Sequence, residues 1–155
     1  LGSSGCWLGI AAGALEYATG HAKKKTFKDF GKAVRDYQVI RHYLADSRIR
    51  LDAGRAMLYA VAQRMDEYTK QGKPHGELLF QLWELKTYAA DSVIDITNKA
   101  LQVTGGVGYK RGKVEQYYRD GRAGAVMGPT NEMCREWIGK TMVELPLEYW
   151  FEGGA

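Results

Sequence analysis

The sequence predicts an all-α fold, an antiparallel four-helix bundle with a short additional helix. Two observations lead to this prediction. In three long segments apolar residues recur at alternating spacings of three and four, a pattern that fits one face of a helix and that no strand could use. Short connections containing glycine or proline separate these segments, as in antiparallel bundles. Because the chain has 155 residues and a domain has roughly 150, we expect one domain over residues 1–155.

The three long helices follow from their apolar faces. The first is expected over residues 3–24, the second over 34–71 and the third over 76–103. The second helix has the small residues Ser47 and Gly54 on its apolar face, where a neighbouring helix can approach closely, and it should end near Gly72. Gly105 and Gly106 should end the third helix. The apolar faces are Leu8, Ala11, Leu15, Ala18 and Ala22; Ile40, Leu44, Leu51, Leu58, Val61, Met65 and Tyr68; and Leu78, Leu82, Leu85, Ala89, Val93, Ile96, Ala100 and Val103.

The last third of the chain predicts two shorter helices. A short helix is expected over residues 114–123, followed by a break at Gly128 and Pro129. Thr130 or Asn131 can cap the final helix, expected over residues 131–144, which supplies the fourth helix of the bundle. The tail over residues 147–155 is too short for a helix of its own, and we expect it to pack on the bundle or to cover a partner.

Composition excludes several protein classes. With 45% hydrophobic and 26% charged residues the chain is an ordinary globular domain, and no apolar run approaches the roughly 20 residues of a membrane span. Cys6 and Cys134 stand alone, which argues against a disulfide framework and a zinc site, so we expect no metal and a reducing, cytoplasmic compartment. The absence of an initiator Met before Leu1 predicts that the chain starts inside a longer polypeptide.

Charge is unevenly distributed around a net value of +4. Residues 20–55 hold ten Lys or Arg against four Asp, whereas residues 114–155 hold four Lys or Arg against seven Glu or Asp. The basic part either faces an anionic partner or forms a solvated helix face. Both readings stay open.

Most catalytic motifs are missing. His21, His42 and His75 have no partners at metal-ligand spacing, and the chain has neither a Gly-x-Ser-x-Gly elbow nor a Walker loop. What remains is a glycine-rich turn over residues 102–109 and a polar break over residues 128–132. Each can be simple helix capping, or a place where a ligand touches backbone and helix N-terminal N–H groups.

Four motifs, in this order and spacing, resemble the C-terminal helical domain of flavin-dependent acyl-CoA dehydrogenases. They are residues 30–32 leading to 36–40, then 102–109, 117–122 and 128–132. The resemblance implies a helical bundle with FAD lying between domains and across a subunit interface. It implies acyl-CoA as the substrate, further domains of the same polypeptide, a homo-oligomer (dimer or tetramer) and an electron-accepting flavoprotein as partners. The positions that it implies for FAD contacts are Gln38, Gln102, Gly105, Gly106, Thr130 and Glu132.

Two positions depart from the family pattern. Phe27 stands where the family usually places an arginine that meets the flavin pyrophosphate, and Lys28 or the lysines at 23–25 are the candidate substitutes. Gly128 stands where many members have the glutamate that removes the α-proton of the substrate. A minority of members carry that carboxylate on the helix that opens the domain, so we expect the base upstream of Leu1. The catalytic residue is therefore unassigned, and a member without dehydrogenase chemistry is the alternative.

Three functions follow in order of preference. The first is the C-terminal domain of an FAD-dependent acyl-CoA dehydrogenase, inactive alone, that oxidises an acyl-CoA thioester to the trans-2-enoyl-CoA. The second is a DNA-binding role, because the chain resembles the alkylation-damage response flavoprotein and residues 20–55 are basic; nucleic acid is nonetheless not the expected partner, since aromatic residues are few there. The third is a structural or oligomerising helical module.

Overall fold

The computed structural model describes residues 1–27 and 31–147. The sequence predictions for Lys28, for Phe30 and for the tail beyond Leu147 lie outside these residues. Within them the fold is helical, which confirms the predicted fold class, and no helix there is long and apolar enough to cross a membrane. The elements are α1 (Gly2–Lys24), β1 (Thr26–Phe27), β2 (Lys32–Ala33), η2 (Val34–Asp36), α2 (Gln38–Gln71), η3 (His75–Leu78), α3 (Leu79–Thr104), α4 (Gly106–Tyr109), α5 (Lys113–Val126) and α6 (Asn131–Met142).

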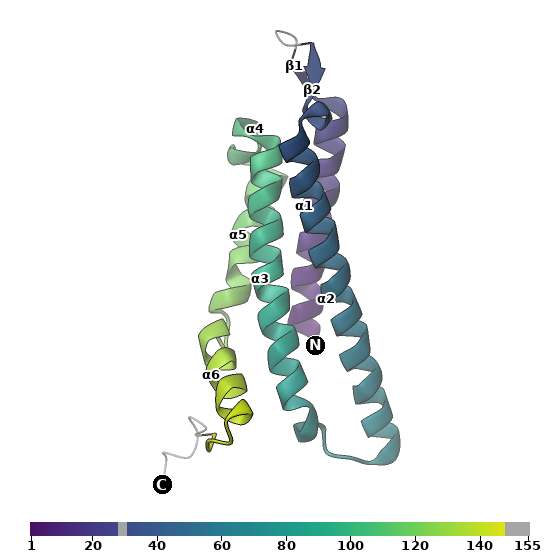
Figure 1. The fold of residues 1–155 in the computed structure, drawn as a ribbon, viewed down its shortest axis with the longest axis vertical. Coiled ribbons are helices and arrows are strands. Elements are labelled where there is room, and N and C mark those ends of the chain that lie inside the picture. Colours follow the sequence, from purple (N-terminus) through teal and green to yellow (C-terminus); the bar gives the residue numbers. More distant parts are fainter. Residues whose placement is uncertain (28–30, 148–155) are drawn as a thin grey trace.

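Helix α3 lies in the middle of the bundle. It packs against α1, α2, α5 and α6 (Figure 1), and the apolar face predicted for it is buried except for Leu82, which is half-buried. All five residues of the predicted face of α1 are buried as well. The close approach predicted at Gly54 is confirmed, because a Cβ there would lie 2.7 Å from Cδ2 of Leu8.

The fourth position of the bundle is shared by two helices. Helix α5 packs against α1 and α3, and α6 continues along α3 below it (Figure 1). The short helix is longer than its predicted range of 114–123, and the final helix is slightly shorter than 131–144. The two are separated at Gly128 and Pro129, as the sequence predicts, and Thr130 is the residue that caps α6, since its Oγ1 accepts the N–H of Met133 at 3.3 Å.

The starts of α2 and α3 differ from the sequence prediction for a local reason. Residues 34–36 form the 3₁₀ turn η2, where the side chain of Asp36 accepts the N–H of Ala33 at 2.8 Å, and Tyr37 is extended. Helix α2 therefore begins at Gln38. Similarly, η3 precedes α3, which begins at Leu79. The turn η2 and the β1–β2 hairpin form the connection between α1 and α2, which lies at the end of the bundle where α3 finishes (Figure 1).

A buried polar cluster attaches α6 to α3. The ammonium group of Lys86, whose residue is only 7% exposed, donates to Oδ1 of Asn131 at 2.6 Å. Asn131 in turn donates through Nδ2 to Asp91 at 2.8 Å, and Arg135 pairs with the same carboxylate. Burial lowers the pKa of Lys86, and its ammonium also lies 5.5 Å from the ring centre of Trp7. Burial of an ammonium group destabilises the fold unless the group is hydrogen-bonded. The stability of this cluster therefore depends on the hydrogen bond that Asn131 accepts.

We predict that Asn131→Ala destabilises the fold by about 3 kcal/mol, because it leaves the buried Lys86 ammonium without its acceptor. The measurement is urea denaturation of the 155-residue chain followed by circular dichroism. The matched control is Asn98→Ala, since Asn98 lies on the exposed side of α3 and its replacement should change stability by no more than about 0.5 kcal/mol. Equal effects of the two substitutions would refute the role assigned to Asn131.

Candidate functional site

A pocket of about 680 Å³ opens at the end of the bundle where α3 finishes. We call it the apolar pocket. Its walls come from the end of α1, the hairpin, η2, the start of α2, the end of α3, and α4. Its lining residues are His21, Lys25, Phe27, Val34, Tyr37, Val39, Ile40, Gln102, Val103, Thr104, Gly105, Gly106, Val107 and Lys110.

The glycine turn gives this pocket an open backbone wall. Gly105 has a φ of +59°, in the left-handed region that favours glycine, and its N–H donates to the carbonyl of Leu101 at 2.8 Å. Its carbonyl accepts the N–H of Gly108 at 2.9 Å, which starts the single turn of α4. A Cβ placed on Gly105 or Gly106 would meet nothing within 4 Å. A ligand can therefore lie directly against the backbone of these two residues.

Aromatic rings form the wall on the hairpin side. Phe27 pairs with Lys32 across the two short strands, and its ring meets that of Tyr37 edge to face, with 6.3 Å between the ring centres. The position where an arginine was expected therefore does line the pocket, but it supplies an aromatic ring instead of a guanidinium. This wall can exclude water from a planar ligand and cannot bind its phosphates.

Three basic side chains line the pocket as well, and only one of them, Lys25, is among the lysines named above as candidate phosphate contacts. They are His21 of α1, Lys25 directly after α1 and Lys110 directly after α4. Burial, and next the charge of Lys25, lower the pKa of His21. The spacing of four between His21 and Lys25 puts both on one side of α1, a signal present in the sequence. That this side faces the glycine turn depends on how the helices pack.

The structure brings together three of the six candidate flavin contacts. Gln102, Gly105 and Gly106 all line the apolar pocket. Gln38 is the exposed first residue of α2 and stands between two lining residues, Tyr37 and Val39, without lining the pocket itself.

The other two candidates, Thr130 and Glu132, lie apart at the start of α6. Asn131 between them is bonded to Asp91, eleven residues before Gln102 on α3, which is about 16 Å along the helix at 1.5 Å per residue. Glu132 is exposed, and hydrogen bonds to its own backbone and to the Thr130 side chain lower its pKa. The six residues thus form two groups, one at the apolar pocket and one at the start of α6.

The break before α6 carries no carboxylate at the position where the family has its base. Gly128 is exposed, and a Cβ there would meet nothing within 4 Å, so the position has room for a side chain. Close by on α6, Cys134 is fully buried, and burial raises the pKa of its thiol. This thiol is therefore not an activated nucleophile.

Comparisons with known proteins agree with the architecture. A solved structure described as a probable acyl-CoA dehydrogenase from Mycobacterium abscessus superposes with a TM-score of 0.80 at 30% identity, over 91% of this chain and 35% of that one. The 3-sulfinopropanoyl-CoA desulfinase of Paraburkholderia xenovorans is 31% identical over 92% of this chain and 34% of its own length. The 3-(aryl)acrylate reductase of Clostridium sporogenes is 34% identical over 88% of this chain and 34% of its own length.

These matches share one family and one region. The chain spans about a third of the length of the curated relatives that it matches. The family described as "Acyl-CoA dehydrogenase, C-terminal domain" matches residues 1–143, nearly the whole chain. Members of this family are flavoprotein oxidoreductases. The helical bundle, its glycine turn and this match together show that the chain belongs to the acyl-CoA dehydrogenase family, as its C-terminal domain.

Proposed function

We propose that this chain is the flavin-contacting C-terminal domain of an FAD-dependent acyl-CoA dehydrogenase that oxidises an acyl-CoA thioester to the trans-2-enoyl-CoA. The observation that carries the proposal is the apolar pocket, whose wall at Gly105 and Gly106 is bare backbone. Because the chain spans about a third of its relatives, the remaining walls of the active site are assigned to other domains of the same polypeptide.

The residues of the pocket fit part of a flavin nucleotide. When bound, FAD supplies the acceptor for the hydride that leaves the substrate. The side-chain amide of Gln102 can donate and accept hydrogen bonds, while Gly105 and Gly106 let a bulky group touch the main chain. Phe27 and Tyr37 keep water from the ligand.

The division of the candidate contacts into two groups supports a homo-oligomer. Gln102, Gly105 and Gly106 form one group, and Thr130 and Glu132 form the other. If FAD lies across a subunit interface, each chain contributes one group to its own cofactor and the other group to the cofactor of its partner. We propose a dimer or tetramer on this basis, with electrons passing to a separate flavoprotein.

The packing of α1 on α5 supports a catalytic base on the segment upstream of Leu1. A Cβ on Gly124 would lie 3.2 Å from Cδ2 of Trp7, so the end of α5 lies beside the start of α1. A segment that continues α1 before Leu1 would therefore come close to the break containing Gly128. A carboxylate carried there can serve the site that a glutamate in place of Gly128 would serve, held in a dry cleft that raises its pKa for removal of the α-proton.

The DNA-binding alternative is less favoured, because aromatic residues are few in residues 20–55 and part of the charge there is paired. Arg48 pairs with Asp52 and Arg50 with Asp95, while Asp46 pairs with Lys99. The lysines at the end of α1 are left without such pairs among the described residues. We also propose a cytoplasmic location, which the two free thiols support.

We predict that the isolated chain is colourless and binds FAD no tighter than about millimolar. A few hydrogen bonds worth about 0.5 to 1.5 kcal/mol each cannot offset the roughly 4 to 15 kcal/mol of freedom lost on association. Isothermal titration with FAD measures this directly, with circular dichroism to establish that the chain is folded. A micromolar dissociation constant would mean that the bundle holds a complete flavin site.

We predict that Gly106→Leu in the full-length protein lowers flavin content at least tenfold without unfolding it. A Cβ at Gly106 meets no atom within 4 Å and lies on the pocket wall, so we expect the new side chain to occupy the space of the ligand. The ratio of flavin to protein absorbance is the measurement. Gly139→Leu is the matched control, because a Cβ at Gly139 also meets nothing within 4 Å but lies on α6, away from the pocket. Equal flavin content in both variants would contradict the assignment.

We predict that neutralising the acidic residues on the helix segment upstream of Leu1 abolishes acyl-CoA oxidation in the full-length enzyme, with a loss of at least about 100-fold in kcat, as expected for removal of a general base. Flavin content should stay unchanged, because the flavin contacts lie elsewhere. Full dehydrogenase activity after these substitutions would show that the base is not on this segment.

A further inference from the structure

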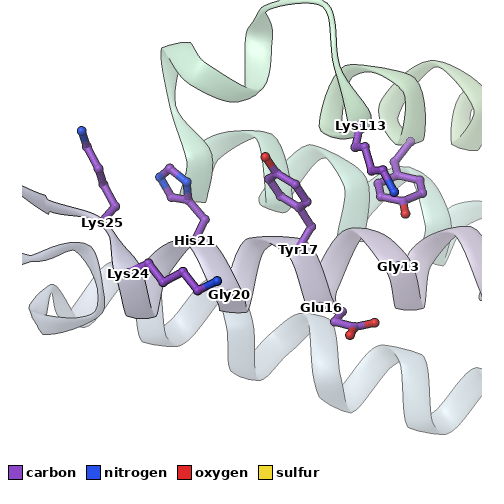
Figure 2. A pocket seen from close by; sticks show the side chains of 9 residues that line it. Gly13, Glu16, Tyr17, Gly20, His21, Lys24, Lys25 and Lys113 are labelled. Carbon is purple, nitrogen blue, oxygen red and sulfur yellow. The ribbon is translucent and has the colours of Figure 1, made fainter.

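Polar side chains converge on Asn131 at the start of α6, although the site is buried. Lys86 is 7% exposed and Asn131 is 1% exposed. By contrast, Figure 2 shows that Lys24, Lys25 and Lys113, near the other end of α1, lie apart from one another and point in different directions. The lysine that the fold buries is therefore the one that has a defined set of partners.

Both ends of the Asn131 amide are used. Its Oδ1 accepts a hydrogen bond from Nζ of Lys86 at 2.6 Å, and its Nδ2 donates to Oδ1 of Asp91 at 2.8 Å. Because an ammonium group can only donate and a carboxylate can only accept, the amide fits in one orientation. Both partners belong to α3, and Arg135, one turn further along α6, pairs with the same carboxylate. These contacts fix the rotation of the first turn of α6 about its axis.

The residues on either side of Asn131 are the candidate flavin contacts Thr130 and Glu132. Thr130 is half-buried and Glu132 is exposed. Since a helix has 3.6 residues per turn, the inward direction of Asn131 also sets the directions of its two neighbours. A rotation of α6 that broke the contacts of Asn131 would therefore move both candidate flavin contacts.

Stability alone does not account for a lysine at position 86. Replacing a buried charged group by an apolar group of similar volume often leaves the stability unchanged or raises it, because the charged group is costly to remove from water. The buried ring of Trp7, whose centre is 5.5 Å from the Lys86 ammonium, offers a surface on which an apolar side chain can pack. The orientation of Asn131, in contrast, does require a hydrogen-bond donor at this position.

We propose that Lys86 is a positioning residue, whose hydrogen bond to Asn131 fixes the start of α6 so that Thr130 and Glu132 reach the flavin. Lys86 is buried and acts only through Asn131. The inference rests on the proposed function, because it takes these two residues as contacts of FAD. It extends that function by giving a role in cofactor binding to a side chain that lies behind the contact residues.

The first test compares Lys86→Met with Lys99→Met in the full-length protein. Lys99 is the matched control, because it lies on the same helix, its side chain is only 16% exposed, and it pairs with Asp95 and with Asp46 of α2 instead of a residue of α6. The flavin is removed, each apoprotein is titrated with FAD, and flavin fluorescence gives the dissociation constant. Thermal melting followed by circular dichroism compares the stabilities.

We expect Lys86→Met to raise the dissociation constant for FAD at least about fivefold, the size of one lost hydrogen bond. Its melting temperature should not fall below that of Lys99→Met, because the substitution also removes a buried charge. Lys99→Met should bind FAD within about twofold of the parent, since it leaves the start of α6 unchanged.

A second pair of variants keeps the buried lysine. Asn131→Asp retains an acceptor for Lys86 but places two carboxylates side by side, because Asp91 then loses its amide donor. We expect this variant to weaken FAD binding at least as much as Lys86→Met does. Adding Asp91→Asn restores a donor for each acceptor at the net charge of the parent. The double variant should therefore bind FAD within about twofold of the parent.

The outcomes separate this proposal from the proposed function. Weaker FAD binding by Lys86→Met but not by Lys99→Met, with recovery in the double variant, supports the positioning role. Parent-like FAD binding by Lys86→Met, losses of affinity that follow the melting temperature in both lysine variants, or no recovery in the double variant overturns the positioning role and leaves the proposed function standing. If Lys86→Met does not fold, the Asn131 variants decide. A full-length parent that binds no FAD contradicts the proposed function, and this role with it.

Discussion

The central position of α3, which packs against four other helices, is the constraint on which the rest of the structure depends. Because α3 packs against α1, α2, α5 and α6, its residues fix the positions of both groups of candidate flavin contacts. Its end leads into the glycine turn of the apolar pocket, and its middle holds the start of α6 through Lys86, Asn131 and Asp91. A change in the packing of α3 would therefore displace both groups together.

The helices and their inner faces were predictable from the sequence, because the spacing of three and four survives in any context that buries one side of a helix. The cap at Thr130 was predictable as well, because the hydrogen bond that forms it joins residues only three positions apart, Thr130 and Met133. By contrast, the burial of Lys86 was not predictable, because a lysine is normally expected at the surface. The contacts with Asn131, 45 residues away, and with the ring of Trp7 make the burial of Lys86 acceptable.

The candidate site was predictable in part. The motif resemblance placed Gln102, Gly105 and Gly106 together, and the structure puts all three in one pocket. The resemblance did not predict that Thr130 and Glu132 lie apart from these three residues, because the order of motifs along the sequence does not give their distances in the folded bundle. Lys25 was among the lysines named as candidate phosphate contacts, but His21 was missed, because its role depends on which side of α1 faces α4 and α5, and helix packing decides this.

The flavin assignment requires that the glycine turn lies against the cofactor. A crystal structure of the full-length protein with FAD tests this most directly. We expect the side chain of Gln102 or the backbone of Gly105 and Gly106 within hydrogen-bond or van der Waals distance of the cofactor, about 3 to 4 Å, with Phe27 and Tyr37 beside it. A structure in which another part of the protein fills the apolar pocket, with FAD bound elsewhere, would contradict the assignment.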